Sequence, residues 1–275
     1  SLADDPRPLR LCYAGEVAAI TADQLDPARQ RLQLGAELIG ADSVAAAAEV
    51  VTLAIEALEA AGATGISVDL TLPDLVDVLA REAMPLDDEQ IIEVRRELDT
   101  KDAGGLRDAG GEAYLPLIYA TGAFDEAVER LAAIDAGGAL ASRIDGLKAI
   151  AGRVSGSARI TLDPTERHGF EYQSWFGFTI YADGVRGALG RGGTYTIAGT
   201  DEAATGFSLY IDRLIDALDN PPSRQTVFLP LGHEAAAAAA LRAKGWRTRA
   251  ALSELDDAVT LKCSHRLEGT EAVAL

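Results

Sequence analysis

The stretch Arg31-Leu-Gln-Leu-Gly-Ala-Glu-Leu-Ile39 alternates between polar and apolar residues, a pattern that is typical of a β-strand. Gln33 and Glu37 fall on one face of this strand, and its leucines fall on the other. A second stretch of β-forming residues, Leu9-Arg-Leu-Cys-Tyr13, comes before it. We therefore predict two antiparallel strands that are joined by a long polar loop over residues 21–29.

The segments downstream add a helix and a third strand. Residues 44–61 are rich in alanine, and Ser43 is a suitable N-cap for a helix over this range. Residues 66–72 predict a strand, and three polar side chains on one of its faces could line a pocket. These are Ser67, Asp69 and Thr71.

The middle of the chain changes to a helical pattern. From about residue 74 to residue 155, apolar residues recur at helical spacing between glycine-containing breaks, which predicts a helical insertion. Strand character returns at 158–162, at 174–182 and around 187–189. Residues 204–218 are predicted to form a helix.

A turn-rich stretch, Asn220-Pro-Pro-Ser223, suggests a link between two parts of the chain. We place a core domain at 1–220 and a small C-terminal α/β unit at 221–275. The predicted elements of that unit are a strand over 226–231, a helix over 233–244 and a strand over 258–261. The fold class is therefore α+β.

Composition excludes several classes of protein. The 275 residues carry 25 Lys and Arg against 43 Asp and Glu, a net charge of −18, which would repel a nucleic-acid backbone. Cys12 and Cys263 are the only cysteines, too few for a disulfide framework or a zinc site, and they favour a reducing cytoplasm. No apolar run approaches the roughly 18 residues that a membrane span needs. We expect a cytoplasmic protein that binds neither nucleic acid nor membrane.

The sequence contains no recognisable catalytic constellation. The glycine-rich stretch Arg186–Gly193 lies between predicted strands and lacks the Lys-Ser/Thr ending of a phosphate loop. His233 and His265 have no second ligand near them in the sequence. We therefore expect no catalytic residue, no metal and no cofactor.

Three segments, in order, resemble a known family. Pro8-Leu-Arg-Leu-Cys-Tyr-Ala-Gly-Glu-Val17 and the strand up to Gly40 are similar to motif 2 of class II aminoacyl-tRNA synthetases. Residues 167–196 resemble the signatures of the histidyl branch, and residues 205–214 resemble motif 3. The similarity is greatest to the regulatory subunits of ATP phosphoribosyltransferase, which are paralogues of histidyl-tRNA synthetase. The segments that resemble this group are Pro8–Val17, Gln33–Gly40, Arg186–Gly193 and the ending Lys262–Gly269.

The resemblance implies an antiparallel sheet flanked by helices and a non-catalytic role. Such subunits are needed for the activity of the short catalytic subunit and for its feedback inhibition by histidine, in the first step of histidine biosynthesis. The expected partners are that catalytic subunit, a second copy of this chain as a homodimer within the hetero-oligomer, and histidine. Motif 1, which contributes to the family's dimer interface, has no counterpart in these residues.

Departures from the synthetase pattern indicate that adenylation is absent. Motif 2 needs an arginine to hold the ATP α-phosphate, and Ala18 and Ala19 stand at this place. Arg213 matches the motif 3 arginine that stacks on ATP, so we assign it to a vestigial nucleotide site. The alternative for Arg213 is an ion pair with a nearby carboxylate.

Four residues match those that hold histidine in the synthetase. They are Gln33, Glu37, Glu171 and Tyr172. Amide and carboxylate acceptors suit the donors of histidine, and an aromatic wall excludes water. Gly35, between the first two, would leave room for a ligand. In the alternative interpretation these residues are relics, and Tyr172 only packs.

Two other functions remain open at this point. The first is a histidyl-tRNA synthetase or amino-acid ligase that activates histidine with ATP. The second is a structural scaffold that binds no small ligand.

Overall fold

The structure of the protein, a computed structural model, divides the chain into two compact units, Ser1–Ala217 and Leu218–Leu275. Each unit is described by itself, beginning with the larger. The residues that the structure describes are 5–18, 29–134, 137–167, 172–218 and 225–275.

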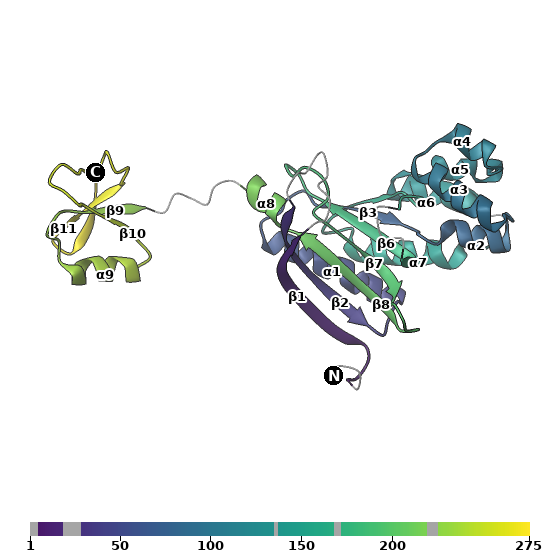
Figure 1. Ribbon diagram of the computed structural model, residues 1–275, viewed down its shortest axis with the longest axis horizontal. Helices are drawn as coiled ribbons and strands as arrows, with labels where there is room; N and C mark the ends of the chain where they lie inside the picture. The colour runs from purple at the N-terminus through teal and green to yellow at the C-terminus, as the bar shows by residue number, and fades with distance from the viewer. Residues whose placement is uncertain (1–4, 19–28, 135–136, 168–171, 219–224) are drawn as a thin grey trace. The chain divides into compact units, whose positions relative to one another are not determined.

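The first unit is built on an eight-stranded sheet with the order β1-β2-β8-β7-β6-β3-β5-β4 (Figure 1). Its strands are β1 (Leu9–Ala18), β2 (Gln30–Ile39), β3 (Ser67–Thr71), β4 (Gly122–Ala123), β5 (Arg159–Leu162), β6 (Gln173–Tyr181), β7 (Gly190–Thr196) and β8 (Ala203–Tyr210). All neighbours are antiparallel except β3 and β5, which are parallel. The predicted α+β fold with an antiparallel sheet is confirmed, with this one parallel pair added.

The hairpin of β1 and β2 positions the residues singled out in the sequence. Its register pairs Leu9 with Ile39 and Tyr13 with Gly35. Leu38 is buried in the core, while β1 is exposed along most of its length because it forms the edge of the sheet. The alternation on β2 therefore separates a core face from a face that can carry a site.

Helix α1 (Val44–Ala60) begins at Ser43, whose Oγ accepts a hydrogen bond from the backbone N–H of Ala46 at 3.3 Å. Its buried face consists mainly of alanine and valine, so the helix lies close to β8 and to α7 (Ala141–Val154). The Trp175 indole N–H donates to the carbonyl oxygen of Asp42 at 2.7 Å, which ties β6 to the start of this helix. Together these contacts hold one side of the core.

The segment between β3 and β5 is mainly helical and gathers at one end of the sheet (Figure 1). Besides α7, its helices are α2 (Leu75–Glu82), α3 (Asp88–Asp99), α4 (Ala103–Asp108), the short 3₁₀ helix η2 (Glu112–Tyr114), α5 (Leu115–Ile118) and α6 (Phe124–Ile134). Asp87 and Gln90 form a reciprocal capping box at the start of α3. The two-residue strand β4 also belongs to this segment and returns it to the sheet beside β5.

Two predictions in the second half of the core are wrong. Residues 204–218 form strand β8 followed by helix α8 (Asp212–Ala217), not one helix. Strand β8 is a central strand that is buried on both faces, so its short apolar run lacks the alternation that distinguishes a strand from a helix. Likewise, residues 187–189 form no strand, and the strand in this region is the glycine-rich β7.

The second unit has a four-stranded sheet with the order β10-β9-β11-β12 and one helix. Its elements are β9 (Thr226–Leu229), α9 (Ala235–Ala243), β10 (Arg247–Ala250), β11 (His265–Glu268) and β12 (Glu271–Ala274). The strand predicted at 258–261 is wrong, because this stretch is a turn in which the Asp257 carboxylate accepts backbone N–H groups from Val259 and Thr260, each at 2.9 Å. No helix within the described ranges has both the length and the apolar content to cross a bilayer.

Candidate functional site

Gln33 lies at the centre of a small polar network on the open face of β2. Its Nε2 donates to the Tyr13 hydroxyl at 3.0 Å and to the Ser208 hydroxyl at 2.9 Å. These two hydroxyl oxygens are 2.7 Å apart, so they also share a hydrogen bond. The network joins β1, β2 and β8. It also occupies the Gln33 amide, which would otherwise be available to donate to a ligand.

Glu37 lies four residues further along the same face and accepts a hydrogen bond from the Tyr195 hydroxyl at 2.8 Å. Burial raises the pKa of Glu37, and the hydrogen bond from Tyr195 opposes this effect. The carboxylate packs over Gly206 of β8, where an added Cβ atom would overlap Glu37 Oε2. Glycine is therefore required there while Glu37 keeps this position.

Tyr172 stands beside these residues with 60% of its surface exposed. Its ring meets the Tyr195 ring edge to face, with centroids 5.7 Å apart. The structure thus brings Gln33, Glu37 and Tyr172 to one region of the sheet. Glu171, the fourth predicted ligand residue, lies outside the described residues.

A cavity of about 30 Å³ lies within this region. Such a volume holds a water molecule or two, whereas typical ligand pockets measure roughly 300–1,000 Å³. Side chains that contribute to its lining include Glu37, Tyr172, Gln173, Arg191, Tyr195 and Ser208. A bound amino acid would therefore need the aromatic side chains to move.

The space above Gly35 is filled and not open. A Cβ atom added at Gly35 would lie 2.6 Å from the Tyr13 ring. Because Tyr13 and Gly35 are paired across the hairpin, both belong to the same face of the sheet, and the ring lies where the glycine has no side chain. The expectation that Gly35 leaves room for a ligand is corrected accordingly.

Sequence reasoning missed three residues of this site, Tyr13, Tyr195 and Ser208. Tyr195 belongs to Gly192-Gly-Thr-Tyr-Thr196, an altered form of a histidyl-branch signature within residues 167–196, and this could have marked it. Ser208 lies on β8, five residues before Arg213. Tyr13 carried no signal of its own, since its role depends on the register of β1 against β2.

Arg213, at the start of α8, reaches back over the chain before β7. Its Nη1 donates to the carbonyl oxygens of Arg186 at 3.4 Å and of Ala188 at 3.3 Å. Gly187 lies between these two carbonyls and has a φ of +75°. Arg213 therefore helps to shape this loop, and its assignment to a former nucleotide site stays a prediction.

The position predicted for the motif 2 arginine falls at the end of β1. Ala18 is exposed there and pairs with Gln30, while Ala19 lies outside the described residues. A methyl group offers no hydrogen bond or charge to a phosphate. In the ranges covered by the structure, no group of three His, Cys, Asp or Glu side chains is placed to hold a metal ion.

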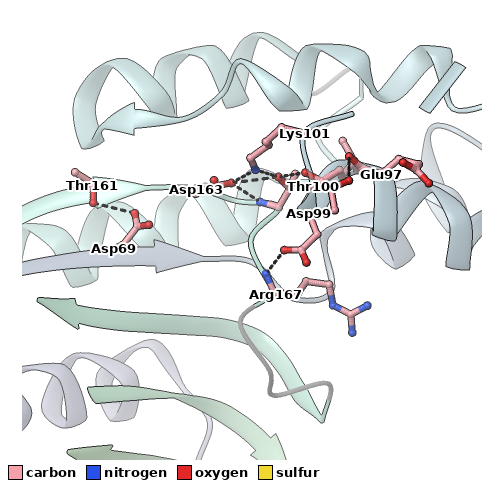
Figure 2. Close-up of polar contacts among 10 residues, drawn as sticks. Asp69, Glu97, Asp99, Thr100, Lys101, Thr161, Asp163 and Arg167 are labelled. Atoms are coloured by element: carbon pink, nitrogen blue, oxygen red, sulfur yellow. Dashed lines mark hydrogen bonds and ion pairs between the residues drawn. The ribbon is translucent and has the colours of Figure 1, made fainter. Parts of the chain in front are cut away.

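A second polar cluster, the β3–β5 cluster, is formed by Asp69, Lys101, Thr161, Asp163 and Glu166. Figure 2 shows Thr161 beside Asp69 and Lys101 beside Asp163. The Thr161 hydroxyl donates to Asp69 Oδ1 at 2.8 Å, and Lys101 Nζ donates to Asp163 Oδ1 at 2.6 Å. Of the polar face predicted on β3, Ser67 and Thr71 are buried.

Burial and the neighbouring carboxyl groups favour the protonated form of Glu166. Burial, the neighbouring Asp69 carboxyl and Asp163 raise the pKa of Glu166 from 4.5 to about 8, while Lys101 lowers it. The folded chain therefore keeps a proton that the unfolded chain releases between these two values. Stability from this group is complete below about pH 4.5 and is lost as the pH rises through about 8.

Replacement of Glu166 by Gln should remove this loss, because the neutral amide resembles the protonated acid. Between pH 5 and pH 9, the free energy of unfolding should fall in both proteins, but by about 1 kcal/mol less in the variant than in the wild type. This figure is smaller than the pKa shift alone would give, because solvent screens a partly exposed carboxyl group. Urea unfolding at several pH values measures the difference. Glu126→Gln, at a 70% exposed side chain on α6, is the control and should follow the wild type. If the free energy of unfolding depends on pH in the same way in Glu166→Gln and wild type, the raised pKa of Glu166 is wrong.

Comparison with known proteins places this chain in a family. Residues 1–214 match the family model described as histidyl-tRNA synthetase. The ATP phosphoribosyltransferase regulatory subunit of Rhodospirillum centenum is 42% identical over 90% of this chain and 65% of its own length. That of Paramagnetospirillum magneticum is 40% identical over 97% of this chain and 72% of its own length. The chain thus spans about two thirds to three quarters of these relatives.

Solved structures agree with this assignment. An ATP phosphoribosyltransferase regulatory subunit/histidyl-tRNA synthetase from Bacillus halodurans has a TM-score of 0.75 and 25% identity, covering 95% of this chain and 73% of its own. The ATP phosphoribosyl transferase (HisG:HisZ) complex from Thermotoga maritima has a TM-score of 0.61 at 19% identity. The match covers 76% of this chain and 75% of the chain in that complex, and it supports the fold. With its class II synthetase fold and these relatives, the chain belongs to the ATP phosphoribosyltransferase regulatory subunits, within the histidyl-tRNA synthetase family.

Proposed function

We propose that this chain is the non-catalytic regulatory subunit of an ATP phosphoribosyltransferase, acting in the cytoplasm in the first step of histidine biosynthesis. It would be required for the activity of the short catalytic subunit and would mediate feedback inhibition by histidine. The observation that carries this proposal is the geometry at β2, where Gln33 and Glu37 share one face while Ala18 stands in place of the arginine needed for adenylation. Family membership supports it.

The chain would contribute no reacting group to phosphoribosyl transfer. Its effect would come from contacts that favour one arrangement of the catalytic subunits over another. Histidine can shift such an equilibrium only if it binds one arrangement more tightly than the other. A pocket that is too small for histidine in one arrangement and widens in another meets this requirement, and the 30 Å³ cavity beside Tyr172 and Tyr195 fits the narrow form.

Histidine would bind at Glu37, with Gln33, Tyr172 and Glu171 as the other ligand residues. The Glu37 carboxylate would accept from the ammonium or imidazole group, since a cationic ligand compensates the burial of its charge. The Gln33 amide would rearrange its bonds to Tyr13 and Ser208 to admit the ligand. Arg213 would remain as a residue of the former nucleotide site, with a structural role.

The complex would contain the short catalytic subunit and at least two copies of this chain. Strand β1 supports self-association or cover by another chain, because its ten residues form a sheet edge with Leu11, Tyr13 and Val17 at 36–39% exposure. The complex from Thermotoga maritima is an assembly of two kinds of subunit. We carry that arrangement over to this chain as part of the proposal.

Mixing the chain with its short catalytic subunit tests the regulatory function. We expect phosphoribosyl transfer from phosphoribosyl pyrophosphate to ATP to rise on mixing and to fall again when histidine is added. The assay follows product absorbance with and without each component. If mixing gives no rise in rate, the regulatory proposal is wrong.

The rival function is a histidyl-tRNA synthetase or amino-acid ligase, which the retained Arg213 would favour. Such an enzyme forms histidyl-adenylate and therefore exchanges pyrophosphate into ATP when histidine is present. The regulatory proposal expects no exchange above background. A scaffold without a ligand would show neither this exchange nor any thermal shift with histidine.

A further inference from the structure

The turn between α3 and α4 contacts the segment that leads into the proposed histidine site. Lys101 lies in this turn with a left-handed backbone φ of 58°. Its Nζ donates to Asp163 Oδ1 at 2.6 Å (Figure 2). It also donates to Thr165 Oγ1 at 2.5 Å. One ammonium group therefore connects the helical insertion to the residues that follow β5.

Two more contacts hold the same segment against α3. The Thr165 hydroxyl, which is buried, also lies 3.1 Å from Asp163 Oδ1 and 3.4 Å from the carbonyl oxygen of Leu98. The backbone N–H of Arg167 donates to Asp99 Oδ1 at 2.9 Å. Residues 163–167 are thus fixed by the end of α3 and by the turn after it.

Charge makes the lysine more important than a single hydrogen bond would be. Asp69, Asp163 and Glu166 bring three carboxyl groups into the β3–β5 cluster, and Lys101 faces them with a positive charge. These groups are partly buried, so their interactions are screened less than those of surface charges. Loss of the ammonium would leave the Asp163 carboxylate without its cation beside the other carboxyl groups and would loosen the segment.

The segment leads directly to the site. Tyr172 follows Arg167 by five residues, which limits the distance between them to about 18 Å even for an extended chain. The Tyr172 ring in turn packs against Tyr195, the hydrogen-bond donor to Glu37. An anchor at Arg167 therefore limits how far Tyr172 can lie from the end of α3.

We propose that Lys101 is a positioning residue for histidine binding, which acts by fixing residues 163–167 and through them Tyr172. The inference rests on the histidine site proposed above. It also gives the helical insertion an influence on that site, because a partner that displaces the Lys101 turn would change histidine affinity, and histidine would change the partner's affinity by the same factor.

Lys101→Met tests this role, since methionine keeps an unbranched side chain and the same backbone cost at positive φ but removes the charge. We expect the Kd for histidine, measured by calorimetry on the full chain, to rise about fivefold to tenfold. Lys101→Arg should restore most of the affinity, because a guanidinium can still donate to both Asp163 and Thr165.

A matched control separates positioning from general loss of stability. Arg143 of α7 forms an ion pair with Asp74 at the start of α2, with Nε donating to Oδ1 at 3.1 Å. The side chains of this pair are 22% and 21% exposed, comparable with 31% and 19% for Lys101 and Asp163. Arg143→Met should therefore lower the melting temperature by a similar amount but change the histidine Kd less than twofold.

Asp163→Asn gives a second route if Lys101→Met folds poorly. It should weaken histidine binding as Lys101→Met does, and the double variant should lose little more than either single variant. An unchanged Kd in Lys101→Met, or equal losses in Lys101→Met and Arg143→Met, would overturn the positioning role. Absence of histidine binding by the wild type would overturn the proposed site itself, and this result is distinct because it appears before any variant is compared.

Discussion

Replacement of Glu37 by Gln should weaken histidine binding by roughly tenfold to one-hundredfold, the effect of losing a charged hydrogen-bond partner. The glutamine carbonyl can still accept from the Tyr195 hydroxyl, so the shape of the site is kept. What disappears is the negative charge that a bound ammonium or imidazolium would meet. Calorimetric titration of histidine into wild type and variant measures the change.

The control for Glu37→Gln is Glu49→Gln on α1. Glu49 also carries a hydrogen-bonded charge in the first unit, but it pairs with Arg10 away from the site, with Arg10 Nε donating to Oε1 at 2.6 Å. The Glu49→Gln variant should bind histidine with the same affinity as the wild type. Equal affinity in wild type and Glu37→Gln would remove Glu37 from the list of histidine ligands.

The pH dependence of histidine binding follows from the same group. Because burial raises the pKa of Glu37 in the free chain, its carboxyl takes up a proton at a higher pH than a solvent-exposed glutamate does. A cationic ligand favours the ionised form of Glu37, so histidine should bind more weakly as the pH falls through the raised pKa. At such acidic pH, histidine binding should release a proton from Glu37.

Much of the fold could be predicted because several elements carry their signal locally. Strand β2 alternates, and α1 has both a cap at Ser43 and a continuous helical pattern. Strands β7 and β8 could not be predicted in this way, since β7 contains three glycines and β8 is buried on both faces. Their conformation is set by neighbouring strands and not by their own propensity.

The glycines of β7 show what sequence reasoning lacks. A Cβ atom at Gly192 would lie 2.5 Å from the carbonyl oxygen of Gly206 and 2.6 Å from the Phe178 ring. The glycine is thus selected by atoms from β6 and β8 that are near only in the folded chain. In the same way Gln33 and Glu37 could be identified from β2 alone, but Tyr13 and Ser208 required the register of three strands.

Gly35→Ala should destabilise the first unit by about 3 kcal/mol, at the upper end for overpacking. The added methyl group would overlap the carbonyl oxygen of Phe207 and lie 2.6 Å from the Tyr13 ring. Tyr13 could rotate away, but the Phe207 oxygen belongs to a backbone that is paired on both sides, with β2 and with β7. Denaturant unfolding, followed by circular dichroism, measures the loss.

Gly15→Ala is the matched control, because Gly15 also lies in the hairpin, two residues beyond Tyr13 on β1. A Cβ atom there would meet no heavy atom within 4 Å. Alanine also restricts the unfolded chain more than glycine, so this variant should be neutral or more stable by up to about 1 kcal/mol. Similar stability losses in both variants would mean that glycine is needed for the hairpin backbone itself. A loss confined to Gly35→Ala would instead locate the constraint in the contact of β2 with Phe207 and Tyr13, the packing that closes the space beside Gln33.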